Sequence, residues 1–124
     1  MIKRTINIDD YWEVIVCYDI DYNLFHIVSK DLAQIGCSKL QIRSIYNNMQ
    51  KGSAKGVTVS SAQCETSVVL FNAHRSIADY INSIVHEAEH IKQSMLNAYN
   101  INDFGEPPAY TIGYIATQLL MFLL

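Results

Sequence analysis

Residues 76–99 read SIADYINSIVHEAEHIKQSMLNAY and form the longest helical pattern in the chain. Apolar residues recur here at the three- and four-residue spacing of one helix face. At 100° per residue, six of them fall within about 40° of one line, and we expect this line to face the core. The six are Ile77, Ile81, Ile84, Ala88, Ile91 and Met95. Ser76 and Asp79 are typical of an N-terminal cap, so the helix is predicted to begin there and to end near Tyr99.

The same stretch contains the motif His86-Glu87-Ala88-Glu89-His90. Two histidines four residues apart lie one helical turn apart, on the side of this helix away from the apolar line. Their imidazoles can bind one divalent ion, because zinc–nitrogen bonds of about 2.0–2.1 Å suit this spacing. Glu87 directly follows the first histidine, where its carboxylate can take a proton from a water on the ion. Alternatively, the two histidines lie on a merely solvated helix face.

A catalytic zinc has three protein ligands and one open position. Downstream of His90 the carboxylates available are Asp103 and Glu106. Glu106 precedes Pro107-Pro108, at the predicted start of a last helix, and we favour it as the third ligand, with Asp103 as the second choice. The alternative is that Glu106 only complements the helix dipole.

Tyr110 and Tyr114 follow Glu106 by four and eight residues, on the same helix face. A tyrosine hydroxyl near the ion can donate to a developing oxyanion, although core packing accounts for the pair equally well. Gly113 would allow close approach to the histidine helix. His74 is predicted to be a loop residue and His26 a half-buried helix residue.

The remaining patterns predict a small α+β domain spanning residues 1–124. Strands are predicted at Trp12–Tyr18, Val57–Ser60 and Thr66–Phe71, the last being either an edge strand or a central one. Helices are predicted from residue 21 or 23 to Ile35, from Ser38 to Met49, and from Pro107 to the C-terminus. The expected order is β-α-α-β-β-α-α, with a short, mostly antiparallel sheet packed on helices.

The composition excludes several classes of protein. Of the 124 residues, 50% are hydrophobic and 17% are charged, which excludes an intrinsically disordered chain. The net charge is −3 and the nine Lys and Arg residues form no dense run, so we expect no nucleic-acid partner. Three cysteines without a CxxC pair predict free thiols, as in a reducing compartment.

The two ends of the chain differ in character. The first ten residues contain no apolar run of the kind that a signal peptide has. Residues 107–124 carry no charge and end in LLMFLL, yet they are short and interrupted for a membrane span. We expect instead a buried or partner-packed helix, because a monomer rarely exposes such a patch.

These motifs resemble the minimal gluzincin-like zincins, HExxH zinc metallopeptidases with small predicted members in bacteriophage and prophage genomes. The resemblance covers roughly residues 66–118, through the HExxH motif and the later run Gly105-Glu106-Pro-Pro-Ala109-Tyr110. It implies a zincin-like fold, with His86, His90 and Glu106 as zinc ligands and Glu87 as the catalytic base. This chain departs from larger gluzincins in its shorter spacing before the third ligand.

The expected function is hydrolysis of a peptide bond in a peptide or protein substrate, with zinc as the cofactor. The alternative is a non-enzymatic assembly or virion component of a phage or mobile element, in which zinc is structural. That component would use the apolar C-terminal tail to form a homo-oligomer or to bind a phage protein. Either protein would lie in the cytoplasm, that of the host bacterium if phage-encoded, or in the virion. A third possibility is a plain globular domain with surface histidines.

Overall fold

The computed structural model describes residues 1–101 and 106–121, with side chains described for all of these except 106–110. The described chain has an α+β fold with four strands, one short 3-10 helix and four α-helices. In chain order they are β1 (Ile2–Ile8), β2 (Trp12–Tyr18), η1 (Tyr22–Leu24), α1 (Phe25–Gln34), α2 (Lys39–Gln50), β3 (Gly56–Ser61), β4 (Thr66–Phe71), α3 (Ile77–Ala98) and α4 (Glu106–Leu120).

The strands form one mixed sheet in the order β1-β2-β4-β3. β1 and β2 pair antiparallel, as do β3 and β4, whereas β2 and β4 are parallel. The parallel pair arises because the chain leaves β2, forms α1, α2 and β3, and returns through a hairpin into β4. The sheet is therefore mostly antiparallel, as expected. β4 is a central strand and β3 occupies an edge.

One strand is missing from the predicted order. β1 precedes β2 as the first arm of a hairpin, with Ile8 opposite Trp12. Its second half alternates in burial, since Ile6 and Ile8 are buried while Thr5 and Asn7 are exposed. That alternation is the period of a strand with one covered face. It could have been read from the sequence Thr-Ile-Asn-Ile.

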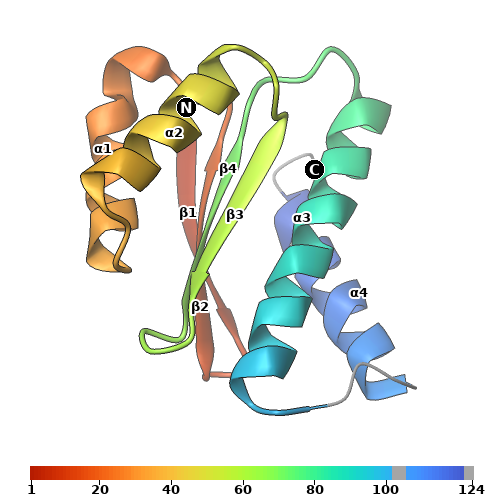
Figure 1. Ribbon diagram of the computed structural model, residues 1–124. Coiled ribbons are helices and arrows are strands. Elements are labelled where there is room, and N and C mark those ends of the chain that lie inside the picture. The colour runs from red at the N-terminus through yellow and green to blue at the C-terminus, as the bar shows by residue number, and fades with distance from the viewer. Residues whose placement is uncertain (102–105, 122–124) are drawn as a thin grey trace.

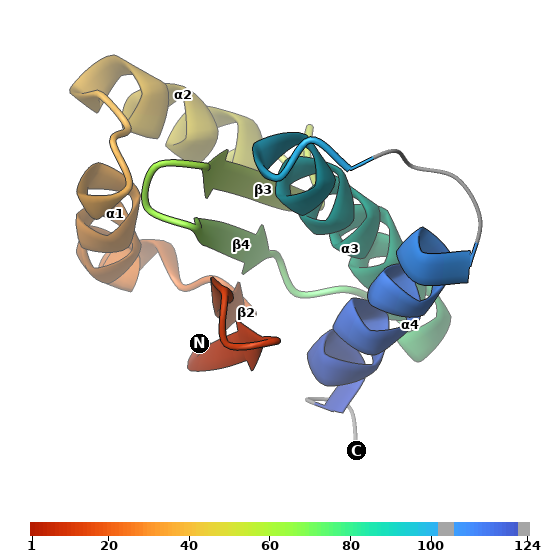
Figure 2. The same ribbon diagram turned by 90° about the horizontal axis from the view of Figure 1, so that it is seen from below.

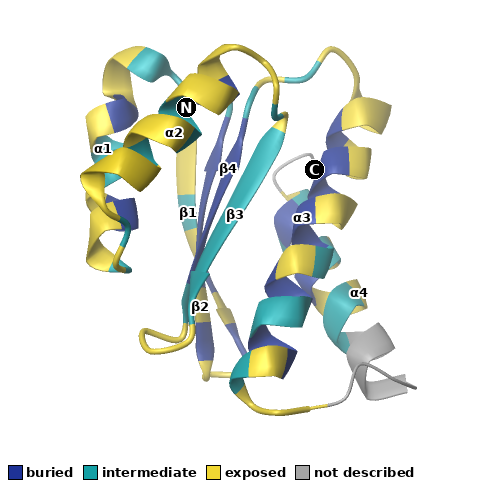
Figure 3. Cartoon of the chain, viewed as in Figure 1, coloured by how far each residue is buried: buried dark blue, intermediate teal, exposed yellow. Residues whose placement is uncertain are grey.

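The sheet lies between two pairs of helices (Figure 1), with α1 and α2 on one face and α3 and α4 on the other. The central strands are buried and the edge strand β3 is half-buried (Figure 3). Alternate residues of β2 therefore enter different cores. Val14, Val16 and Tyr18 pack with α3 and α4, whereas Ile15 and Cys17 pack with α1 and α2.

The buried face of α3 differs from the predicted one at its N-terminal end. Ile77 and Ile81 are 66% and 39% exposed, whereas Tyr80 is buried. The helix meets the sheet along a line that also includes Glu87, of which only 4% is exposed. The predicted line treated all isoleucines as core residues. Packing against the sheet turns the helix so that a tyrosine and a glutamate face inward.

α4 lies beside α3, on the flank away from β3 (Figure 2). Its last turn is held by two side chains from the sheet. The Tyr18 hydroxyl donates to the Leu119 carbonyl across 2.8 Å, and Arg4 donates to the Gln118 carbonyl across 3.3 Å. Leu119 is fully buried. No helix in the described part of the chain is long and apolar enough to cross a lipid bilayer.

Candidate metal centre

The structure brings His86 and His90 together on the solvent-exposed side of α3. Their Nε2 atoms lie 3.2 Å apart, and the two ring planes cross at 86°. Two zinc–nitrogen bonds of about 2.0–2.1 Å at a tetrahedral angle would separate their nitrogens by about 3.3 Å. The pair therefore has the separation that two ligands of one tetrahedral ion require. At this separation a hydrogen bond joins the two rings.

Glu87 turns from this pair toward the sheet. One carboxylate oxygen, Oε1, accepts a hydrogen bond of 2.9 Å from the Thr58 hydroxyl on β3. Gly56, at the start of β3, allows the carboxylate to lie against the backbone: a Cβ there would be 3.2 Å from Glu87 Oε2. The HExxH motif predicts that Glu87 lies beside a metal-bound water. It does not indicate that Glu87 is buried against the edge strand β3.

His86 and Glu87 nevertheless line the same cavity, which we name the Glu87 cavity. It has a volume of about 400 Å³ and lies between α3 and the loop that leads into β3. Its lining is mainly polar and comprises Ser53, Ala54, Lys55, Gly56, Asn82, Ser83, His86 and Glu87. A group in this cavity can therefore contact an imidazole and a carboxylate at once.

The proposed third ligand lies outside the side chains that the structure describes. The side chains of Glu106 and Tyr110 lie outside the described residues, and so does Asp103. Among the residues that the structure describes, no three His, Cys, Asp or Glu side chains gather closely enough to hold a metal ion. Tyr114 is described and is 45% exposed on α4. It does not appear among the residues that line the Glu87 cavity.

His74 occupies a fixed position between β4 and α3. Its Nδ1 lies 2.6 Å from the Asn72 carbonyl, and its Nε2 lies 2.7 Å from the Ser83 hydroxyl. A carbonyl only accepts, so Nδ1 carries the proton, and in the neutral ring Nε2 accepts from Ser83. The ring also stacks on Tyr80 at 4.3 Å between ring centroids. Both nitrogens are thus occupied, a constraint that the sequence did not reveal.

Two further residues of types that can bind metals, His26 and Cys17, are remote from the histidine pair. His26 is exposed on α1, across the sheet from α3, rather than half-buried as predicted. Cys17 is buried in the core between the sheet and the α1–α2 layer. Burial raises the pKa of Cys17 to about 11, so this cysteine stays a neutral thiol near pH 7.

A substitution at Gly56 tests how tightly Glu87 packs, and the same substitution at Gly113 serves as the comparison. Gly56→Ala is expected to lower the free energy of unfolding by about 1–3 kcal/mol, because the new methyl group would crowd Glu87 and buried Phe71. Gly113→Ala should instead raise it by about 0.5–1 kcal/mol, because alanine suits a helix interior better. Among the described residues, no atom outside the neighbouring backbone of α4 lies within 4 Å of a Cβ placed on Gly113, so the close approach of α4 to α3 expected there is not found.

Urea unfolding of both variants beside the original protein provides the measurement. Equal midpoints for the two variants would contradict the packing described for Glu87.

No protein-family model, curated protein or solved structure matches this chain. The features that point to a function are the chain's own residues: a histidine pair at metal-binding separation, and a buried glutamate that lines a cavity together with His86.

Proposed function

We propose that this protein is a zinc-dependent metallopeptidase with a zincin-like fold. His86 and His90 would hold the ion, with Glu106 as third ligand, and Glu87 would act as general base. The observation that carries the proposal is the 3.2 Å separation of the two Nε2 atoms. A carboxylate on the adjacent residue lines the same cavity as His86.

The donor set suits zinc, for which two imidazoles and a carboxylate are common ligands. When bound, zinc would polarise the substrate carbonyl and lower the pKa of water toward about 7. Glu87 would take the proton from the attacking water and return it to the leaving amine. The hydrogen bond from Thr58 fixes Oε1 of that carboxylate, so the base has a defined orientation. Tyr110 and Tyr114 remain candidates for donating to the oxyanion.

The edge strand β3 supports a peptide as the substrate. Among the described strands only β4 pairs with it, so its other edge presents backbone donors and acceptors. An extended peptide can add to such an edge as a further strand. β3 begins at Gly56, which lines the Glu87 cavity. A peptide paired with β3 would thus pass close to Glu87.

Zinc binding tests the proposal directly. The purified chain is expected to bind about one zinc ion, and zinc at a hundred times its dissociation constant should add about 2.7 kcal/mol to the free energy of unfolding. EDTA should remove this increment. His86→Ala and His90→Ala should abolish it, and Glu106→Gln should weaken it.

His26→Ala is the matched control, since it removes an exposed histidine from α1. The proposal fails if elemental analysis finds no zinc and EDTA leaves the unfolding curve unchanged. That result would favour a plain globular domain with surface histidines.

The alternative, an assembly component with a structural zinc, rested on the apolar tail. Part of that tail is already covered within this chain, because Leu119 is fully buried against the sheet. Met121 is 50% exposed, and residues 122–124 lie outside the described part. Both proposals predict zinc binding, and hydrolysis separates them. Because part of the apolar tail is already covered within this chain, we rank the peptidase first.

A further inference from the structure

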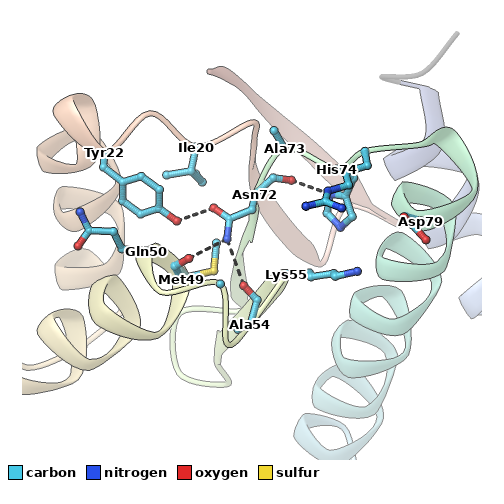
Figure 4. A pocket seen from close by; sticks show the side chains of 12 residues that line it. Ile20, Tyr22, Met49, Gln50, Ala54, Lys55, Asn72, Ala73, His74 and Asp79 are labelled. Carbon is cyan, nitrogen blue, oxygen red and sulfur yellow. Dashed lines mark hydrogen bonds between the residues drawn. The ribbon is translucent and has the colours of Figure 1, made fainter.

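A cavity lies at the carboxyl ends of the parallel strands β2 and β4. It has a volume of about 600 Å³ and is bounded by the end of α2 and the start of α3 (Figure 4). We name it the Asn72 cavity. The carboxyl ends of parallel strands are where α/β sheets commonly bind ligands. Nothing in the proposed peptidase mechanism uses this cavity.

Hydrogen bonds of the Asn72 side chain join the segments that form the wall of the Asn72 cavity. The Asn72 amide donates to the carbonyls of Met49 and Ala54 across 2.9 and 3.1 Å, and its oxygen accepts from the Tyr22 hydroxyl. The amide thus joins β4 to the end of α2 and to the loop before β3. Because both of its protons are used, Asn72 shapes the cavity and is not the group that recognises a ligand.

The charged side chains that line the Asn72 cavity are mostly positive. Lys55 and Arg75 line the cavity together with one acid, Asp79. The ion pairs found in the described part of the chain are Lys3 with Asp31 and Lys92 with Glu89, so neither Lys55 nor Arg75 belongs to one. His74 also lines the cavity, but both ring nitrogens already have partners. Lys55 and Arg75 are therefore the groups able to bind an anion.

The Asn72 cavity adjoins the Glu87 cavity. Ala54 and Lys55 line both, so the two cavities share part of their wall. We propose that the Asn72 cavity binds a carboxylate of the peptide whose cleaved bond lies in the Glu87 cavity, with Lys55 and Arg75 as its partners. This inference rests on the proposed function and narrows the substrate class. The substrate would carry an acidic side chain or a free C-terminus on one side of the cleaved bond.

Three peptide probes test the inference: Ac-Ala-Ala-Ala-Glu-NH2, Ac-Ala-Ala-Ala-Ala with a free C-terminus, and Ac-Ala-Ala-Ala-Ala-NH2. Each is titrated into the full chain after EDTA treatment, with ¹H–¹⁵N spectra as the readout. At least one carboxylate probe should shift the amides of residues 52–55 and 72–75 and bind about tenfold more tightly than the neutral probe. The probe that binds identifies the source of the carboxylate.

Lys55→Met and Arg75→Met, singly and together, should each remove most of this preference. Lys30→Met with Arg43→Met is the control, because both residues are exposed on α1 and α2 and neither lines the cavity. Equal binding of the charged and neutral probes, or an unchanged preference in the Lys55 and Arg75 variants, overturns the inference.

EDTA treatment makes this result independent of zinc. If the carboxylate probes bind but the chain neither retains zinc nor hydrolyses peptides, the carboxylate site stands and the peptidase fails. If zinc and hydrolysis are found without a preference for carboxylate probes, the peptidase stands and the carboxylate site fails.

Discussion

Glu87→Gln is expected to lower peptide hydrolysis about a thousandfold while the protein still binds about one zinc ion. Glutamine has the shape of glutamate but cannot accept the proton of the attacking water. Its amide oxygen can still accept from Thr58, as Oε1 does across 2.9 Å. The fold and the histidine pair should therefore survive the change. Cleavage of a quenched fluorescent peptide library, with zinc content measured on the same sample, provides the test.

The matched control for this variant is Glu89→Gln on the same helix. Glu89 is half-buried, pairs with Lys92, and does not line the Glu87 cavity. It should retain hydrolysis close to that of the original protein. Full activity in Glu87→Gln would contradict the role of general base. Zinc binding without hydrolysis in the unaltered protein would favour the assembly component.

Local patterns predicted most of the elements correctly because their signals are local. Ser38 caps α2 as expected. Its hydroxyl accepts a hydrogen bond from the backbone N–H of Gln41, and the Gln41 side chain accepts one from the backbone N–H of Ser38. The Ser76 hydroxyl caps α3 through the Asp79 amide. Such contacts span three residues, so sequence spacing alone fixes them. The contact between His86 and His90 is local in the same way, because residues four apart on a helix are neighbours.

The parts that sequence did not reveal depend on contacts between distant residues. Thr58 meets Glu87 only because β3 lies beside α3, and nothing in the spacing of residues 58 and 87 indicates this. The Asn72 cavity likewise requires the parallel pairing of β2 with β4 and the return of α2 beside it. Short motifs therefore indicated which residues could bind a metal. Sheet topology determines where the general base lies and what adjoins it.

The face that α3 buries decides whether Glu87 lines the cavity, and two alanine substitutions can test it. Ile84 is fully buried between α3 and the sheet, whereas Ile81 is 39% exposed three residues earlier. Ile84→Ala should lower the free energy of unfolding by about 2–5 kcal/mol, through lost burial and the cavity left behind. Ile81→Ala should change it by less than about 1 kcal/mol, because its side chain stays partly in water.

The two variants can be compared directly, because the original residue type, the substitution and the helix are the same. Helix propensity favours alanine over isoleucine equally at both sites, so the difference reports burial alone. Urea unfolding monitored by far-UV circular dichroism measures both variants. Equal losses would mean that α3 meets the sheet along the line predicted from its isoleucines. Glu87 would then turn away from Thr58, and the general base would lose the hydrogen bond that orients it.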